Sequence, residues 1–204
     1  MKNRRYLILA LALLAIAFAS TVASAQSAIT SLYNTGVDDT GALLGVGVAD
    51  THYKILSGPS PLYTSGFPGG LAYTTNPHSL WWHPSGNPSA LQWIDPLNNG
   101  NASSPGYVPN GTYRYETTFY LVDCVDPTKV QLMGQFAADD NACIWVNGQN
   151  TNQCATNGYA TPTPFNISGS TLFHSGTNTV DFVVQNTGGG PSGLIVTVLA
   201  KVNP

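Results

Sequence analysis

A strict alternation of apolar and polar residues in the second half of the chain constrains its fold more than any other feature. In TYRYETTFYL, residues 112–121, Arg114 and Glu116 fall on one side. The opposite side carries Tyr113, Tyr115, Thr117, Phe119 and Leu121. A period of two is typical of a half-buried β-strand. Because KVQLMGQFA, ACIWV and TVDFVV repeat the pattern and GLIVTVLAKV closes the chain, at least five strands follow residue 110.

The connections between these strands are short and rich in turn-forming residues, as in VDPTK, VNGQ and SGTN. A parallel sheet would need crossover helices between successive strands, and no segment has the period of an amphipathic helix. Only 8% of the residues are charged, while glycine (21) and proline (14) are plentiful, as in turn-rich β proteins. The sequence therefore predicts an all-β fold, an antiparallel β-sandwich.

The first 25 residues have the pattern of a secretory signal peptide. Basic residues precede an apolar run, and Ala23-Ser24-Ala25 supplies the small residues of a cleavage site before Gln26. The run is too short for a spanning helix, which needs roughly 20 apolar residues. We expect residues 26–204 to form a single secreted β-sandwich domain. Its long loops should lie at about residues 57–111, where proline, glycine, asparagine and serine are dense.

Removal of this peptide leaves four basic residues against ten acidic ones, a formal net charge of −6. Such a surface repels nucleic-acid phosphates and anionic lipids. We therefore expect an extracellular protein with no nucleic-acid partner and no membrane span.

Two acidic clusters are the candidate cation sites. Their residues are Asp38 and Asp39 in NTGVDDTGALL, and Asp139, Asp140 and Asn141 in AADDN. Calcium prefers oxygen ligands of this kind, although neither cluster has the spaced acids of an EF-hand loop. The alternative is turn chemistry, in which an aspartate bonds to its own backbone. We expect no other cofactor.

Three cysteines remain in the mature chain, so at most one internal disulfide can form. The segment IWVNG indicates a strand followed by a type I′ turn at Asn147-Gly148. Because that turn could bring Cys143 and Cys154 together, we favour this pair over those with Cys124, although the sequence alone leaves the pairing open. A zinc site is not expected, since no C-x-x-C or histidine cluster accompanies the cysteines.

Aromatic residues in the irregular first half are the candidate ligand-binding residues. SLWWHP and QWIDP place tryptophans in or beside the loops, with tyrosines nearby. Sugar rings stack on exposed indole and phenol rings, and neighbouring amides and carboxylates bond the hydroxyls. The predicted carbohydrate-binding set is Trp81, Trp82, Trp93, Asp95, Asn99, Asn101 and Tyr107. The alternative is that the rings fold inward and close one end of the sandwich.

The usual catalytic signatures, such as G-x-S-x-G and H-E-x-x-H, do not occur in the sequence. A glycosidase would need two carboxylates flanking a sugar, and nothing in the sequence brings two together. We therefore expect a protein that is not an enzyme, with glycoside hydrolysis as a third hypothesis.

Four stretches carry a family resemblance: SLYNTGVDDTGALLGVGVADTHYKILSGP, LQWIDP, GTYRYETTFYL with DPTKVQLMGQFAADDNACIWVNG, and LFHSGTNTVDFVVQNTGGGPSGLIVTVLAKV. Together they resemble a domain of exported bacterial proteins, many of which carry a PEP-CTERM sorting tail. The second half is also similar to galactose-binding-like sandwiches, the jelly-roll modules found as carbohydrate-binding parts of glycosidases. Matching positions are Asn147, Gly148, Gly176, Asn178, Asn186, Gly189 and Gly193.

The resemblance implies a jelly-roll sandwich in which ligands meet the loops at one end. The chain ends LAKVNP without a sorting tail, so we expect a released protein. We favour the hypothesis that the protein is a secreted, non-catalytic module that binds extracellular or cell-surface carbohydrate. The alternative is a structural or adhesive protein of the matrix or envelope that self-assembles. An unpaired cysteine and a low charge fraction are suited to such assembly.

Overall fold

The computed structural model describes residues 29–59, 70–84, 91–97, 106–156 and 158–203. The expected signal peptide, residues 1–25, and the candidate sugar ligands Asn99 and Asn101 lie outside these ranges. No helix within the described ranges is long and apolar enough to cross a membrane.

The described secondary structure consists of strands and one short 3₁₀ helix, so the predicted all-β class is confirmed. In chain order the elements are β1 (Ile29–Thr30), β2 (Ala49–Ser57), β3 (Gly70–Thr74), β4 (Ile94–Asp95), β5 (Gly111–Leu121), η1 (Pro127–Lys129), β6 (Val130–Asp139), β7 (Asn141–Val146), β8 (Gln149–Ala155), β9 (Thr163–Ser168), β10 (Gly176–Asn186) and β11 (Gly193–Val202). The alternation predicted for β5 is observed, since every second residue from Tyr113 to Leu121 is buried.

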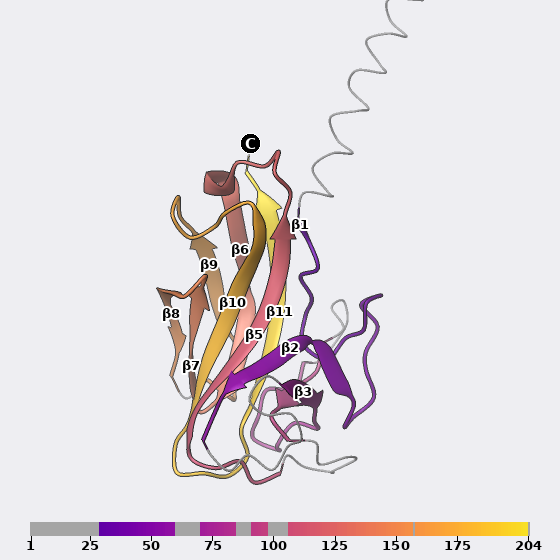
Figure 1. Ribbon diagram of the computed structural model, residues 1–204. Coiled ribbons are helices and arrows are strands. Elements are labelled where there is room, and N and C mark those ends of the chain that lie inside the picture. Colours follow the sequence, from indigo (N-terminus) through magenta and orange to yellow (C-terminus); the bar gives the residue numbers. More distant parts are fainter. Residues whose placement is uncertain (1–28, 60–69, 85–90, 98–105, 157, 204) are drawn as a thin grey trace, which may run out of the picture.

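The strands form one continuous antiparallel sheet that folds over into two layers. The strand order is β8-β7-β10-β5-β2-β3-β4-β11-β6-β9, with β1 added to β5. We call β8, β7, β10 and β5 the front layer, and β4, β11, β6 and β9 the back layer. Figure 1 shows β5 and β10 crossing in front of β6 and β11. This arrangement is the predicted antiparallel β-sandwich.

Phe136 of β6 shows how the two layers pack. Its ring centroid lies 6.1 Å from that of Phe165 in the same layer and 5.8 Å from that of Phe182 in the front layer. All three side chains are buried in the main core. Burial of one such side chain contributes about 1.5–3 kcal/mol, and tilted ring contacts add to it. The contact between Phe136 and Phe182 therefore joins the layers directly.

The β7–β8 hairpin has the predicted turn and the favoured disulfide. Asn147 and Gly148 have φ angles of 48° and 77°, the two left-handed positions of a type I′ turn. This turn pairs Cys143 with Cys154 across the strands. A disulfide with an S–S distance of 2.08 Å joins them, and Cys124 is free and exposed.

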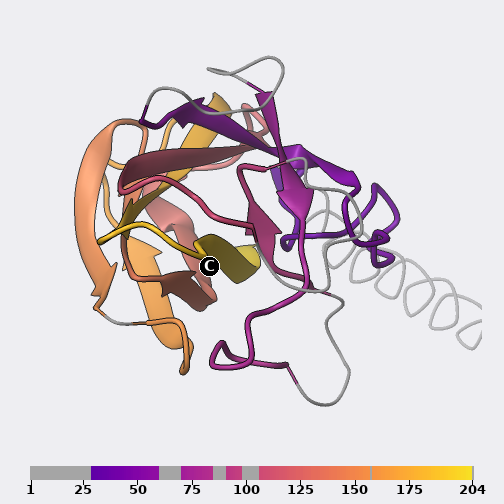
Figure 2. The ribbon, with the colours of Figure 1, turned by 90° about the horizontal axis from the view of Figure 1, so that it is seen from below.

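A second, smaller apolar cluster lies on the outer side of the back layer. Ala137 of β6 pairs with Ile195 of β11, and both belong to this cluster, whereas their chain neighbours belong to the main core. Trp81 and Trp93 cover the two residues, with ring centroids 4.3 Å apart. The described loops between β3 and β4 therefore lie against the outside of the sandwich, and Figure 2 shows these magenta segments to one side of the strands.

Candidate binding site at the loop end of the sandwich

Several connections meet at one end of the sandwich. The end of β10 lies there, where Asn186 pairs with Gly111 at the start of β5. The end of β6 also lies there, where Asp139 pairs with Gly193 at the start of β11. The chain then crosses through Asp140 from the back layer to β7 in the front layer. This crossing therefore stands beside the loop that joins β10 to β11.

Asp139 and Asp140 occupy the crossing and are bonded from several sides. Trp81 Nε1 donates to Asp139 Oδ2 at 2.7 Å. Thr187 donates its backbone N–H and its hydroxyl to Asp140 Oδ2 at 2.7 and 2.6 Å. The main chain is held as well, because Ser192 Oγ donates to the Asp139 carbonyl oxygen at 2.7 Å. These bonds fix the direction of both carboxyl groups.

The pKa values of the two carboxyls are displaced in opposite directions. Partial burial, with a hydrogen bond to Asp140 and the charge of that residue, raises the pKa of Asp139 to about 7. Partial burial also acts to raise the pKa of Asp140, but hydrogen bonds from Thr187 and Asp139 outweigh it and lower that pKa. Below neutral pH the pair therefore shares one proton, which Asp139 carries and donates to Asp140.

The two carboxyl groups line a hollow of about 240 Å³. The buried Trp81 and the half-buried Tyr159 form an aromatic side. Thr187 and Gly189 of the β10–β11 loop also line it. The hollow thus combines strong hydrogen-bond acceptors, ring surface and main chain, as sites for small polar ligands do.

The predicted tryptophan stacking platform is wrong. Trp81 and Trp93 are 3% and 1% exposed, because their rings pack over Ala137 and Ile195. These two strand residues present apolar surface outward, and the loop aromatics cover it. Trp82 is half-buried, and its carbonyl oxygen accepts a hydrogen bond from Trp93 Nε1 at 2.9 Å. Trp81 and Trp93 are buried, as the alternative expects, but they cover the outer side of the back layer rather than close one end of the sandwich.

Two further residues that the sequence predicts to bind sugar, Asp95 and Tyr107, lie in different environments. Asp95 has no exposed surface, and its Oδ1 accepts from the Leu97 N–H at 2.8 Å. It cannot reach a surface ligand, so its predicted role is wrong. Tyr107 is 68% exposed. Its hydroxyl lies so close to Gly189 that a side chain there would collide with it. Tyr107 therefore stands at the rim of the hollow.

The first acidic cluster forms a turn. Asp38 Oδ1 accepts from the Thr40 N–H, the Thr40 hydroxyl and the Ala42 N–H at 2.8, 2.6 and 3.0 Å. These bonds, the Thr40 hydroxyl first, lower the pKa of Asp38. Asp39 instead faces His52, with 2.9 Å between Oδ1 and Nε2. The contacts of Asp38 therefore match the alternative to a cation site, in which an aspartate bonds to the nearby backbone of its own turn.

The second acidic cluster is divided between two surfaces. Asp139 and Asp140 line the loop-end hollow, whereas Asn141 lines a depression on the outer face of the front layer. Within the described part of the chain, no three histidine, cysteine, aspartate or glutamate side chains are grouped as a metal site requires. Calcium binding at either cluster stays a prediction.

Thr187 and Tyr159 line the hollow but were not predicted as site residues from the sequence. The glycine run after Thr187 was an available signal, because Gly188, Gly189 and Gly190 adopt φ angles of 87°, 78° and 125°. Only glycine takes up such angles readily, and runs of this kind let main chain approach a ligand. Tyr159 carried no comparable signal.

No protein-family model matches the chain, and no curated protein is similar enough to count as a relative. The expected link to PEP-CTERM proteins therefore stays a prediction. Among solved structures, a lectin from Pleurotus ostreatus in its apo form is 28% identical over 54% of this chain, with a TM-score of 0.41. The same lectin in complex with GalNAc gives the same identity, coverage and TM-score. This chain spans only 28% and 29% of the two lectin chains.

Two carbohydrate-binding modules of family 35 are also similar. One, from an environmental isolate, is 12% identical with a TM-score of 0.32, covering 64% of this chain and 88% of that module. The other, from Cellvibrio japonicus, is 13% identical with a TM-score of 0.28, covering 78% and 97%. These likenesses are partial, and the sandwich assignment rests on the strand pairing described above.

Proposed function

We propose that this chain is a non-catalytic binding module whose loop-end hollow takes a carbohydrate. The observation that carries the proposal is the carboxyl pair of Asp139 and Asp140 in a hollow beside Tyr159. A sugar presents adjacent hydroxyl groups that donate to carboxylate oxygens. Such charge-assisted hydrogen bonds are about twice as strong as neutral ones. The rings of Tyr159 and Tyr107 provide surface for the apolar faces of the sugar.

The size of the hollow favours a short ligand. Its volume of about 240 Å³ is below the range of about 300–1000 Å³ that is usual for drug-sized ligands. The hollow therefore holds only one or two sugar units of a ligand.

The geometry favours binding over hydrolysis. The two carboxyl groups of a glycosidase stand about 5–5.5 Å apart in retaining enzymes and about 6.5–9.5 Å apart in inverting ones. Asp139 and Asp140 are instead neighbours in the chain whose carboxyl groups interact with each other, so they do not stand on opposite sides of a bound sugar. They are arranged as two acceptors on the same side of a ligand.

An extracellular setting is part of the proposal. The first 25 residues have the signal-peptide pattern, and the Cys143–Cys154 disulfide suits an oxidising compartment. The ligand is then an extracellular or cell-surface polysaccharide.

The test is a glycan array and a polysaccharide pull-down with the secreted chain. Asp140→Asn keeps the shape of the side chain but removes its charge, and should weaken binding at least about tenfold. Asp123→Asn is the matched control, because Asp123 is exposed and follows β5 at the opposite end of the sandwich. It should leave binding unchanged.

Each assay is run with calcium and with EGTA, and loss of binding in EGTA would support a cation in the site. Urea denaturation confirms that every variant is folded. Absence of binding by the folded wild-type chain, with and without calcium, would overturn the proposal.

A second candidate function is self-assembly through Cys124, whose thiol is free and exposed. It lies just after β5, which ends where Leu121 pairs with Gly176, at the end of the sandwich away from the hollow. Size-exclusion chromatography with and without reductant tests this function. A larger species that disappears with reductant and in Cys124→Ser would support it, and a monomer under both conditions would count against it.

A further inference from the structure

The outer face of the front layer carries a second set of side chains suited to a ligand. Residues that pair across the strands share a face and form rows. The middle row contains Cys154, Cys143, Val183 and Arg114. One flanking row contains Asn150, Trp145 and Asp181, and the other contains Asn141, Gln185 and Thr112. Apart from Asp181, which is itself buried, the residues of these rows on β7 and β10 alternate with buried ones, so they face outward.

A trough of about 260 Å³ lies between the flanking rows. Cys143 and Val183 are at its floor, and the half-buried Trp145 stands on one side. Asn141 lines the other side, four positions earlier on the same strand. At about 3.4 Å per residue, the Cα atoms of these two residues are about 13–14 Å apart. The lining residues come from β8, β7, β10 and β5, so the trough runs across the strands.

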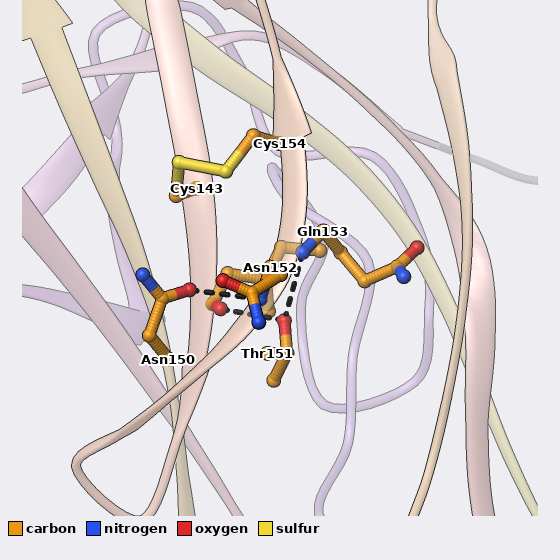
Figure 3. Close-up of a disulfide and its surroundings, with 7 residues drawn as sticks. Cys143, Asn150, Thr151, Asn152, Gln153 and Cys154 are labelled. Carbon is orange, nitrogen blue, oxygen red and sulfur yellow. Dashed lines mark hydrogen bonds between the residues drawn. A yellow bond between two sulfur atoms is a disulfide. The ribbon is translucent and has the colours of Figure 1, made fainter.

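The floor and one side of the trough are held rigidly. Figure 3 shows the bond between Cys143 and Cys154, with Asn150 and Thr151 nearby on β8. Thr151 Oγ1 donates to the Ile144 carbonyl oxygen at 2.7 Å. Asn150 Oδ1 accepts a main-chain N–H two residues further along at 2.8 Å. A surface fixed before binding loses less conformational freedom when the ligand arrives.

Two of the charged side chains next to the trough, Asp181 and Arg114, form an ion pair. Asp181 is buried, and Arg114 donates to both of its carboxylate oxygens at 2.9 and 2.7 Å. Among the described residues that line the trough, none is charged, and they supply an indole, a disulfide sulfur, amides and a hydroxyl. This surface complements a neutral ligand with apolar ring faces and peripheral hydroxyls, whereas an anionic ligand finds no unpaired cation in it.

We propose that this trough binds the interior of a neutral polysaccharide chain, as a second site separate from the loop-end hollow. The Trp145 indole and the disulfide contact the ring faces of the sugars, while the amides of Asn150 and Gln185 bond their hydroxyls. The trough and the hollow share no lining residue. Either site can therefore fail its test while the other passes.

The test is calorimetric titration of the secreted chain with four neutral hexasaccharides, namely cellohexaose, xylohexaose, laminarihexaose and chitohexaose. Hexagalacturonate serves as the anionic comparison. At least one neutral probe should bind, and Trp145→Ala should weaken it at least about tenfold. Tyr120→Ala is the matched control, because Tyr120 is an exposed aromatic residue of β5 that does not line the trough. It should change the affinity less than about twofold.

Gln185→Ala keeps the test decisive if Trp145→Ala does not fold. Gln185 is exposed and lines the trough, so its truncation should weaken the neutral probe at least about threefold without loss of folding. Asp140→Asn should leave trough binding unchanged, and the Trp145 indole N–H resonance should shift on titration.

Three results would overturn the proposal: no neutral hexasaccharide binds the folded chain, hexagalacturonate binds as tightly as the neutral probes, or binding survives both trough substitutions. Loss in Asp140→Asn alone would assign the probe to the loop-end hollow and leave the proposed function standing without this second site.

Discussion

Asn147 donates its side-chain amide to Asn178 Oδ1 at 2.8 Å, which ties the β7–β8 turn to the start of β10. The same amide donates to the Leu172 carbonyl oxygen at 2.7 Å, and Asn147 Oδ1 accepts from the Thr179 N–H at 2.9 Å. Asn147 also adopts a φ of 48°. One residue therefore supplies both the backbone of the turn and three side-chain hydrogen bonds.

Substitution of Asn147 should separate these two contributions. Asn147→Gly keeps the positive φ but loses three bonds of about 0.5–1.5 kcal/mol each, so the free energy of unfolding should fall by about 2–4 kcal/mol. Asn147→Ala should cost about 1 kcal/mol more, because alanine resists the left-handed region. Urea denaturation measures both.

The control for this pair is Asn152→Gly. Asn152 also has a positive φ, 60°, but its side chain is exposed, so the change should stay within about 0.5 kcal/mol. An equally small change for Asn147→Gly would show that its side-chain bonds contribute nothing.

Asp95 should make the protein less stable as the pH rises. Burial raises the pKa of its carboxyl from 3.8 to about 7. Between these values the unfolded carboxyl is ionised and the folded one is protonated, so the free energy of unfolding falls as pH increases. At about 1.4 kcal/mol per pKa unit, the fall between pH 4 and pH 8 is up to about 4 kcal/mol.

Asp95→Asn cannot ionise and should remove this part of the slope. Urea denaturation at pH 5 and pH 8 should show the variant gaining stability relative to wild type at the higher pH. Asp139 contributes a slope of the same sign, but it is present in both proteins and cancels in the comparison. Parallel pH profiles would contradict the assignment.

The hydrogen bond from Trp81 should be visible in the titration of Asp139. The bond lowers the pKa of that carboxyl, against the larger effect of burial. Trp81→Phe retains a ring but removes the donor, so the pKa should move above about 7. Carboxyl ¹³C NMR measures the shift. Trp93→Phe is the control, because the Trp93 N–H bonds to the Trp82 carbonyl oxygen instead and its loss should leave Asp139 unaffected.

Sugar binding in the hollow should strengthen with pH. Ionised Asp139 is a stronger acceptor than its protonated form, so affinity should rise through the raised pKa of about 7. Asp139→Asn should abolish the pH dependence and keep the weaker affinity of the acid range. Titration calorimetry from pH 5.5 to pH 8.5 distinguishes this result from a pH-independent site.

The disulfide should contribute measurably to stability. Cys143 and Cys154 are 11 residues apart, and closure of a loop of this size in the unfolded chain is worth up to about 3 kcal/mol. The double substitution Cys143→Ser and Cys154→Ser should lower the urea midpoint accordingly, and Cys124→Ser should not. An unchanged midpoint in the double variant would mean that the hairpin is already closed in the unfolded chain.

The fold could be predicted further than the site. Alternation places Tyr113 and Leu121 in the core, because a strand with one buried face must repeat every two residues. The orientation of Trp81 and Trp93 has no such local rule, since it depends on which surface the loop covers. The sequence did contain an indication that these two rings would be buried. The unbroken apolar runs around Ala137 and Ile195 indicate strands buried on both faces, which the loop aromatics would cover.

Trp145 illustrates the reverse case. It falls between Ile144 and Val146, so the same alternation that buries these two directs its indole outward. The hollow was less accessible to prediction, because it forms only when the β6–β7 crossing meets the β10–β11 loop. Contacts between segments so distant in the chain follow from topology rather than from local pattern.

The position of Asp139 and Asp140 at a crossing between layers links recognition to folding. Asp139 ends a strand of the back layer, and the residue after Asp140 begins one in the front layer. A molecule held by both carboxyl groups is thus attached to both layers at once, and it must be released before they separate. Its binding free energy would then add to that of the folded state, so a ligand that fills the hollow would make the loop end of the sandwich the part most resistant to unfolding.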